Sequence, residues 1–502
     1  MVHTHVVRVL AQANCPRASN KLLTSIVKEK LRDTPNFKPR EIADEIKRDF
    51  GIELKYSQAW RGIEAAKEEL QGSYKEAYNQ LPWLCEKLVE KNPGSVATLI
   101  TREDLSFHRL FVAFHASLHG FQNGCRPLLF LDSLTLKSKY PSELLTATAL
   151  DGNDGIFPVA FAIVNVVNDD GWYWFLEQLK SAFSRIQRIT FVADRQMGLR
   201  QSISSIFGNS YHGYCLHRLT EDLKEGLKGQ YPQEVLRMII AHFYDAAYAT
   251  TVDGFKKCVG SIENISQEAC EWVLQSEPEH WANALFEGSR YNHIRSDIGG
   301  PFYSWVTELP TLPIVQIIDS MHGKMMELIY NCRVDSDQWS TRLIPSLEDK
   351  LQKQIIGASS LQVLFAPSNC FEVRDGLSAI NVVDIDRWDC SCREWQITGF
   401  PCLHAVAVLQ RIGRNIYDCC SKYFMTEAFQ LTYSESINSI PMADRPVHKE
   451  SSPVQVHPPR LCCPSGPPKK RRIRSKGMVK RPLHCSRCKG AGHNRATCHI
   501  QS

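Results

Sequence analysis

Four cysteine and histidine residues near the C-terminus constrain this chain more than any other feature of its sequence. Cys485, Cys488, His493 and Cys498 have the spacing C-x2-C-x4-H-x4-C, with glycines just ahead of the histidine. Three thiolates and one imidazole make a closed tetrahedral site for a structural zinc ion, and glycines let the backbone turn tightly around the metal. A segment this short has almost no apolar core. Zinc binding would therefore supply its folding free energy, on the order of 10–16 kcal/mol in model fingers.

A second set of candidate metal ligands lies upstream, in the spacing C-x-C-x9-C-x-H. Its members are Cys390, Cys392, Cys402 and His404. We expect residues 384–388 to form a strand that delivers the first pair, and residues 405–409 to form an apolar helix after the second pair. The pattern predicts a second structural zinc ion. The alternative is a set of buried thiols with a core histidine.

The length and composition narrow the class of protein. A chain of 502 residues is long enough for about two to four domains. It has no apolar run of about 18 residues, so we expect no membrane span, and no long apolar stretch at its start that would mark a signal peptide. In such a chain, 18 cysteines indicate metal ligands and buried thiols rather than a disulfide framework.

A basic block, PPKKRRIR, lies inside a Pro- and Ser-rich stretch at residues 440–482. This stretch cannot bury enough apolar surface to fold, so we expect a disordered basic linker. Lys469, Lys470, Arg471 and Arg472 concentrate positive charge of the kind that binds nucleic acid or an import receptor. We therefore predict a nuclear protein with an import receptor among its partners.

Residues 1–95 are expected to be helical. Ile42, Ile46 and Phe50 repeat at helical spacing, Gly51 interrupts the pattern, and a second helical pattern follows. A helix, a short turn with glycine and another helix resemble a helix-turn-helix. Two packed helices without a role in DNA binding are the alternative.

The middle of the chain has the pattern of an α/β layer. Apolar runs at residues 127–132, 144–150 and 157–167, separated by turn residues, predict three neighbouring strands joined by hairpins. The expected order is then helix 172–183, strand 189–194 and helix 201–207. Strands and helices in this order favour an α/β fold with both faces of the sheet covered.

Two aspartates end buried strands of this layer. Asp132 and Asp194 would lie at carboxyl ends of strands, where α/β proteins usually bind ligands. Two carboxylates in such a place can hold Mg²⁺ ions about 4 Å apart for phosphoryl transfer. Aspartates that end strands also serve as helix N-caps, so the pair alone leaves both roles open.

Several blocks of the sequence, in order, resemble the transposase domain of Mutator-like elements. They include FLDSLTLKSKY (130–140), DDGWYWFLEQLK (169–180), ITFVADRQMGL (189–199) and YHGYCLHRL (211–219). The C-terminal ligand set resembles a CCHC zinc knuckle, and the upstream set resembles a SWIM zinc finger, a module tied to DNA and protein binding. The resemblance implies an RNase H-like transposase core with a helical insertion at residues 104–360, a SWIM finger at 371–423 and a knuckle at 483–499.

The resemblance also implies an Asp-Asp-Glu catalytic triad. Asp132 matches its first aspartate and Asp194 its second. Where the family has its glutamate this chain has Gly300, which has no side chain to ligate a metal ion. Asp297 and Glu308 are the candidates for a substitute third acid.

Two further positions depart from the family pattern. The family commonly has C-x2-H after the second aspartate, whereas Cys215 and His217 form C-x-H. In a strand these two residues would share one face, and a buried thiol with a capping histidine is the alternative. Family members usually have an additional zinc finger at the start. Here only His3, His5 and Cys15 remain, which we interpret as a shortened N-terminus.

The sequence thus predicts a transposase-derived DNA-binding or regulatory protein with two structural zinc ions and an impaired catalytic core. Mg²⁺ or Mn²⁺ would be a cofactor only if the core were active. One alternative is an active DDE-type DNA transposase. Another is an RNA-binding protein that uses the knuckle and the basic tail. We expect DNA as the partner, RNA as a further ligand of the knuckle, and no membrane; without coiled-coil heptads, the oligomeric state stays open.

Overall fold

The computed structural model describes residues 20–33, 37–71, 73–185, 188–295, 305, 309–365, 370–375, 379–441 and 455–460. Two compact units divide the chain, Met1–Pro459 and Arg460–Ser502, and almost all described residues belong to the first. Several predicted sites lie outside the described residues: His3, His5, Cys15, Asp297, Gly300, Glu308, Lys469, Lys470, Arg471, Arg472, Cys485, Cys488, His493 and Cys498. The expectations for these positions stay predictions.

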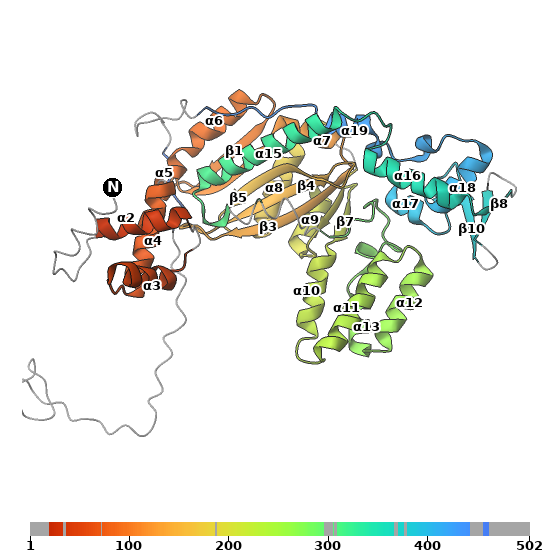
Figure 1. Cartoon of the computed structure of the whole chain (residues 1–502), viewed down its shortest axis with the longest axis horizontal. Coiled ribbons are helices and arrows are strands. Elements are labelled where there is room, and N and C mark those ends of the chain that lie inside the picture. The colour runs from red at the N-terminus through yellow and green to blue at the C-terminus, as the bar shows by residue number, and fades with distance from the viewer. Residues whose placement is uncertain are drawn as a thin grey trace, which may run out of the picture. The chain divides into compact units, whose positions relative to one another are not determined.

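Three N-terminal helices, red in Figure 1, pack on each other. They are α2 (Asn20–Asp33), α3 (Pro39–Phe50) and α4 (Tyr56–Gln71). Val27, Ile42, Ala59 and Ile63 are buried between them, as the helical spacing predicts. Gly51 ends α3 with a φ of 69°, a left-handed conformation that glycine adopts without strain. Two shorter helices follow, α5 (Tyr74–Asn79) and α6 (Leu81–Lys91).

A seven-stranded mixed sheet forms the centre of the first unit, in the order β1-β2-β5-β4-β3-β6-β7. The strands are β1 (Val96–Thr101), β2 (Phe107–Ala113), β3 (Leu128–Leu136), β4 (Ser142–Leu150), β5 (Ile156–Val164), β6 (Thr190–Ala193) and β7 (Tyr211–Tyr214). β3, β4 and β5 are antiparallel neighbours, which confirms the three predicted strands. β6 runs parallel to β3, and β7 parallel to β6. The predicted α/β class is confirmed.

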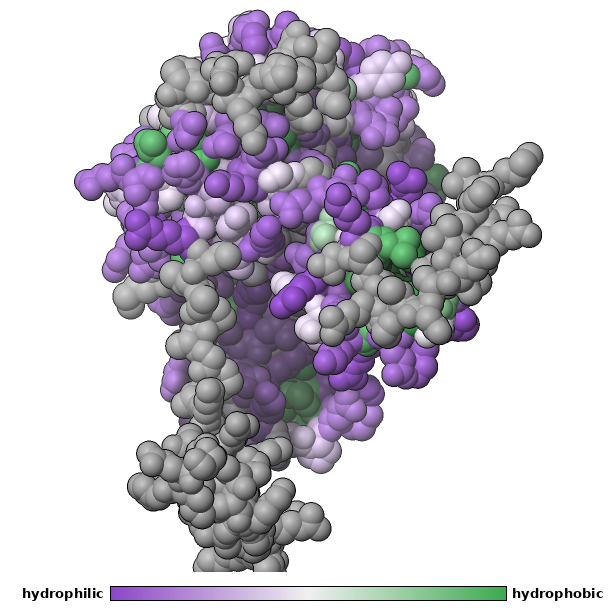
Figure 2. Space-filling model, turned by 90° about the vertical axis from the view of Figure 1, so that its left-hand side faces the viewer, coloured by the Kyte–Doolittle hydropathy of each residue, from purple (hydrophilic) through white to green (hydrophobic). Residues whose placement is uncertain are grey.

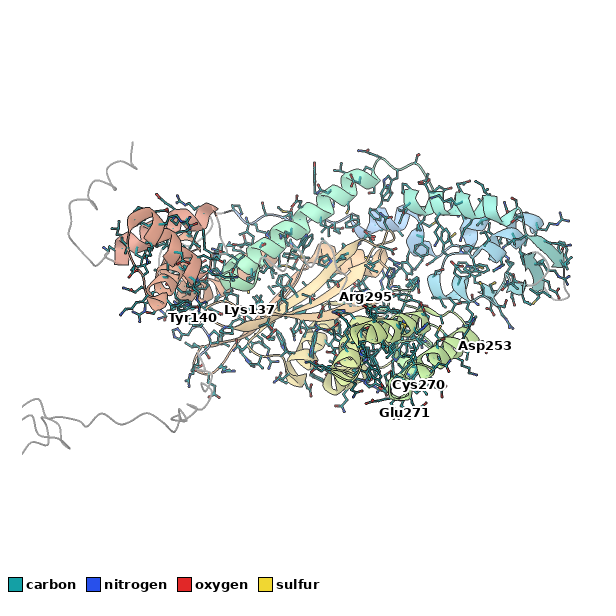
Figure 3. All side chains as sticks on the ribbon, turned by 60° about the horizontal axis from the view of Figure 1, so that its bottom comes forward. Lys137, Tyr140, Asp253, Cys270, Glu271 and Arg295 are labelled. Carbon is teal, nitrogen blue, oxygen red and sulfur yellow. The ribbon has the colours of Figure 1, made fainter. Side chains whose placement is uncertain are left out.

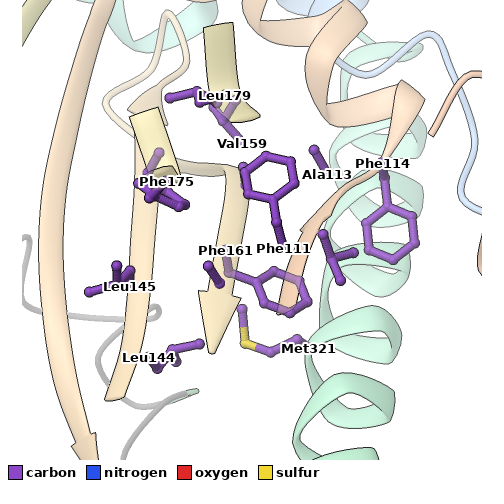
Figure 4. Close-up of a cluster of buried hydrophobic side chains, with 14 of the residues drawn as sticks. Phe111, Ala113, Phe114, Leu144, Leu145, Val159, Phe161, Phe175, Leu179 and Met321 are labelled. Carbon is purple, nitrogen blue, oxygen red and sulfur yellow. The ribbon is translucent and has the colours of Figure 1, made fainter. Parts of the chain in front are cut away.

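Helices supply the apolar side chains that cover this sheet. They are α7 (His115–Asn123), α8 (Asp169–Ala182), α9 (Met197–Ile206), α15 (Ile314–Ser336) and α19 (Thr426–Thr432). Figure 4 shows Phe175 of α8 and Met321 of α15 in one buried cluster with the strand residues Phe111 and Phe161. Each of these four side chains is at most 2 % exposed. Burying one of them is worth about 1.5–3 kcal/mol relative to leaving it in water.

A helical region with its own apolar core follows β7. Its elements are α10 (Leu216–Gly226), α11 (Gln233–Tyr248), α12 (Val252–Glu263), α13 (Gln267–Gln275) and the 3₁₀ turn η1 (Pro278–His280). Trp281 is fully buried at the centre of this core, with its ring 4.8 Å from that of Phe243. In Figure 3, Cys270 and Glu271 mark these helices. Tyr140, in the loop between β3 and β4, lies at the other end of the sheet, near the N-terminal helices.

The last described part is a small module around a four-stranded antiparallel sheet, in the order β11-β10-β9-β8. Its elements are α16 (Pro345–Ala358), β8 (Gln362–Phe365), β9 (Cys370–Asp375), β10 (Ala379–Asp384), β11 (Asp389–Cys390), α17 (Glu394–Thr398), α18 (Leu403–Ile412), η3 (Ile416–Cys419) and η4 (Lys422–Phe424). The prediction of a strand at residues 384–388 is wrong, because β10 ends at Asp384 and a turn follows. The carboxylate of Asp384 accepts hydrogen bonds from the backbone N–H groups of Asp386 and Arg387, which stabilises that turn.

None of the helices in the described ranges has the length and apolar character that crossing a membrane requires.

Candidate metal centres

The predicted ligands of the upstream zinc site come together in space. One ligand atom from each of Cys390, Cys392, Cys402 and His404 lies within 4.8 Å of all the others. Cys390 ends β11, Cys392 follows in the next turn, and Cys402 and His404 stand at the start of α18. Three sulfur atoms and one nitrogen in this arrangement match the donor set of a structural zinc site.

Burial and electrostatics favour metal binding at this cluster. Cys390 and Cys402 are at most 1 % exposed. Hydrogen bonds with Cys390 and Cys402 hold the pKa of the Cys392 thiol far below its ordinary value, whereas hydrogen bonds with Cys390 and Cys392 raise the pKa of Cys402. The cluster therefore contains a thiolate together with protons that a bound zinc ion would displace.

The orientation of the His404 ring is set by a neighbouring amide. Its Nδ1 lies 3.7 Å from the Cys390 sulfur, so Nδ1 is the nitrogen that faces the metal position. Its Nε2 lies 3.1 Å from the side-chain amide of Asn381 on β10. The hydroxyl oxygen of Ser391 lies 3.1 Å from that amide and accepts a hydrogen bond from the backbone of Val382. Such a partner fixes the tautomer and the direction of a metal-binding imidazole.

Aromatic packing supports the module from beneath the ligands. Trp395 is fully buried, stacks on Trp388 at 5.7 Å and donates a hydrogen bond to the carbonyl of Cys419. Cys419 and Cys420 are buried but lie outside the ligand cluster. The module thus has an apolar core in addition to its metal site.

The two predicted acidic residues lie on neighbouring strands. β3 and β6 are parallel, and Phe130 of β3 is paired with Val192 of β6. Asp132 and Asp194 each come two residues after this pair, so they occupy equivalent positions on the two neighbouring chain segments. Asp194 directly follows the end of β6. Asp132, however, does not end its strand as predicted, because β3 continues to Leu136 through its pairing with β4.

An arginine contacts the first of these carboxylates. Arg218 on α10 lies 3.1 Å from the carboxylate oxygen of Asp132. Partial burial lowers the pKa of Arg218, but the charges of Asp132 and Asp194 outweigh it and raise this pKa overall. The guanidinium therefore interacts with both acids, and a divalent cation at Asp132 would have to displace it.

A further acid lies close to Asp194. Asp222 on α10 forms an ion pair of 3.0 Å with Arg195. Burial raises the pKa of Asp222, and Asp194 raises it further, while Arg195 and Arg218 lower it. Within the described ranges, however, Asp132 and Asp194 do not form a three-ligand cluster with another acid. A metal ion at this place does not fit the described side chains as they stand.

The cysteine and histidine after the second aspartate do not share a strand face. β7 ends at Tyr214, Cys215 is the N-cap residue of α10, and His217 lies inside that helix. The interpretation based on strand spacing is therefore wrong. Cys215 is buried at 1 % exposure in a small apolar cluster, which agrees with the alternative of a buried thiol.

One polar cluster was missed by sequence reasoning. Glu277, Glu279 and His280 place their ligand atoms within 4.8 Å of one another. Arg200 lies 2.8 Å from the Glu277 carboxylate and 3.3 Å from His280 Nε2. Tyr214 also donates a hydrogen bond to Glu277. This cluster already contains a cation, so it fastens η1 to α9 and β7 rather than offering a metal site. The sequence EPEH alone gives no indication of these partners.

These features together define a class: a zinc-binding protein in which a Cys₃His module follows an α/β core with paired acids on adjacent parallel strands.

Comparisons with known protein families agree with this class. A MULE transposase domain model matches residues 128–222, which include β3 to β7 and both aspartates. A SWIM zinc finger model matches residues 381–413, which contain all four zinc ligands and Asn381. A comparison with curated proteins finds no match. The chain therefore contains a segment similar to a MULE transposase domain and a SWIM-type zinc finger whose four ligands come together.

Proposed function

We propose that this protein binds DNA through a retained transposase scaffold and no longer cuts it. The observation that carries the proposal is the ion pair between Arg218 and Asp132. Arg218 stands three residues after Cys215, where the C-x2-H pattern of the family places its histidine. A fixed cation on the first catalytic aspartate opposes metal binding there, and Gly300 removes the third acid.

The strand order supports an RNase H-like core. β5, β4 and β3 are antiparallel, and β6 and β7 extend the sheet in parallel from β3. The helices α11 to α13 then stand as an insertion between β7 and α15. Asp132 lies on β3 and Asp194 directly follows β6, the strands that such a core uses for catalysis, so the scaffold fits a transposase even though Asp132 is paired with an arginine.

The N-terminal helices supply a candidate surface for duplex DNA. α3, the turn after Gly51 and α4 have the order of a helix-turn-helix, in which the start of the second helix enters the major groove. Tyr56 and Trp60, one turn apart at the start of α4, are 60 % and 50 % exposed, and Arg61 beside them is exposed. Figure 2 views the molecule from the side where these helices lie, and the described residues on this face are largely hydrophilic.

Zinc would hold two nucleic-acid-binding modules in shape. The SWIM finger has its four ligands in place, and we propose a second ion in the knuckle formed by Cys485, Cys488, His493 and Cys498. The basic block at Lys469 to Arg472 would direct the protein to the nucleus.

A cleavage assay tests the loss of catalysis. The purified chain is incubated with terminal-repeat duplex DNA and Mg²⁺ or Mn²⁺. We expect binding without strand cleavage. The double variant Gly300→Glu, Arg218→His restores both family positions, and the matched control adds Asp132→Asn to it. Cleavage by the unmodified chain that depends on Asp132 would refute the proposal. Cleavage only by the double variant supports it.

A binding assay tests the role of α4. Replacing Trp60→Ala should weaken duplex binding about tenfold if Trp60 contacts the groove. Tyr173 on α8 is a comparable aromatic residue, 44 % exposed, so Tyr173→Ala is the control and should leave affinity unchanged. If both variants bind duplex DNA with the affinity of the unmodified chain, α4 is not the recognition helix.

A further inference from the structure

A small cavity lies where the helical insertion meets the SWIM finger. Asn283, Phe286, Glu287 and Arg290 line it from the insertion, and Arg393 and Gln396 line it from the finger. Its volume is about 110 Å³, several times the space that one water molecule occupies in the liquid. The cavity is open to solvent and therefore accessible to a ligand.

Arg290 is a buried cation without a buried counter-charge. Its side chain is 3 % exposed and lies 4.0 Å above the ring of Phe286. It donates hydrogen bonds to the carbonyl of His280 and the amide oxygen of Asn283. Among the residues that the structure describes, no carboxylate lies within 4.0 Å of its nitrogens. Burial lowers the pKa of Arg290 to about 9, so the group stays charged at neutral pH in a place that disfavours the charge.

Arg393 adds a second positive charge to the same cavity. It has a left-handed backbone with a φ of 62° and directs one guanidinium nitrogen toward the carbonyl of Ala284, 3.4 Å away. In the described part of the chain it too lacks a carboxylate partner within 4.0 Å. Glu287 is the acid that lines the cavity, and it is exposed. Two guanidinium groups therefore face one solvated carboxylate.

Gln396 contributes an unsatisfied acceptor. Its amide nitrogen donates hydrogen bonds to Asp389 and to the carbonyl of Cys390, while its Oε1 is buried without a donor. A buried acceptor left without a donor costs about 1–3 kcal/mol. This oxygen has almost no exposed surface, so a ligand in the open cavity meets the guanidinium groups rather than this acceptor. The lining thus offers positive charge, which suits an anionic group.

We propose that this cavity binds one phosphodiester group of a nucleic acid, with Arg290 and Arg393 contacting the phosphate. Planar guanidinium groups bind phosphate oxygens in pairs. A phosphodiester group of a nucleic acid supplies such an anion. This inference rests on the proposed function, and it assigns part of the nucleic-acid interface to the junction of the insertion and the finger, apart from α4.

The test measures affinity and its salt dependence. Labelled duplex DNA and single-stranded RNA of equal length are titrated separately with the full-length zinc-loaded chain. Arg393→Gln should weaken binding about tenfold and reduce the slope of log K against log salt by about 0.9 for duplex DNA or about 0.7 for single strands. The control Arg411→Gln removes an exposed arginine of the same module outside the cavity and should leave the affinity much closer to that of the unmodified chain.

A second variant makes the test independent of folding damage. Glu287→Gln removes the exposed acid of the cavity, so it should tighten binding, whereas damage to the fold would weaken it. Zinc content and thermal unfolding are compared for all variants. If Arg393→Gln and Glu287→Gln both bind nucleic acid with the affinity of the unmodified chain, this inference is wrong and the proposed function still stands. Absence of any nucleic-acid binding by the unmodified chain overturns both.

Discussion

The amide of Asn381 should strengthen zinc binding although it does not touch the metal. His404 faces the metal position through Nδ1, so the bound, neutral ring has its proton on Nε2. That nitrogen lies 3.1 Å from the side-chain amide of Asn381, whose nitrogen faces it. Turning the amide over by 180° places its oxygen there, where it accepts the hydrogen bond of the Nε2 proton in the zinc-bound state. The hydroxyl of Ser391 contacts the other end of the amide, and because a hydroxyl can donate or accept it pairs with the amide in either orientation.

The size of the effect follows from the role of such partners. Loss of an outer hydrogen bond to a metal-binding histidine typically lowers metal affinity 10–100-fold, which is about 1.4 to 2.7 kcal/mol. Asn381→Ala should fall in this range. Asn381→Asp keeps an acceptor and adds negative charge next to the ring, so it should retain or strengthen zinc binding.

A competition assay measures this difference. Zinc is withdrawn from the full-length chain by a chromophoric chelator, with Cys402→Ala defining the signal when the SWIM site is lost. Asn415→Ala is the matched control, because Asn415 belongs to the same module and caps η3 without contacting a ligand. Should Asn381→Ala retain zinc as well as Asn415→Ala does, or Asn381→Asp lose it equally, the assigned hydrogen bond would be wrong.

Three further predictions concern zinc content, stability and localisation. Cys402→Ala should lower the zinc content by one ion per chain in metal analysis, and an unchanged ion count would contradict the ligand assignment. Tyr433→Phe removes a buried hydrogen bond to Asp151, 2.7 Å long, and should lower the free energy of unfolding by about 1.5–3 kcal/mol at pH 7. Burial raises the pKa of Asp151, and the hydrogen bond from Tyr433 stabilises the ionised form of this carboxylate. The loss of unfolding free energy in Tyr433→Phe should therefore be largest above the pKa of Asp151 and become smaller when urea unfolding is repeated at lower pH. A loss that does not change with pH would contradict this assignment. Replacing Lys469, Lys470, Arg471 and Arg472 together by Ala should abolish nuclear accumulation of a fluorescent fusion, and unchanged accumulation would exclude an import role.

The sequence predicts those parts of the molecule that depend on local spacing. The C-x-C-x9-C-x-H pattern identifies all four ligands that the structure brings together, because a tetrahedral site demands particular residue types close along the chain. The apolar runs identify β3, β4 and β5 because strand burial is visible in local composition.

The sequence does not predict contacts that depend on how distant elements pack. Arg218 meets Asp132 across 86 positions of the chain, and Asn381 meets His404 across 23. No local pattern distinguishes either residue from a solvated surface residue. Asp132 lies within its strand rather than at its end because pairing with β4 extends β3 beyond the contact with β6. Such an extension is set by the partner strand.

The two candidate metal centres differ in how their charges are balanced. At the SWIM finger, three thiols and an imidazole converge in the donor set of a structural zinc ion. At the acidic site, Asp132, Asp194 and Asp222 meet the guanidinium groups of Arg195 and Arg218. Among the described side chains, three carboxylates and two guanidinium groups leave one net negative charge, which is too little to hold two divalent cations against displacement of the arginines. The same chain therefore favours zinc at the Cys₃His cluster and opposes a divalent cation beside Asp132.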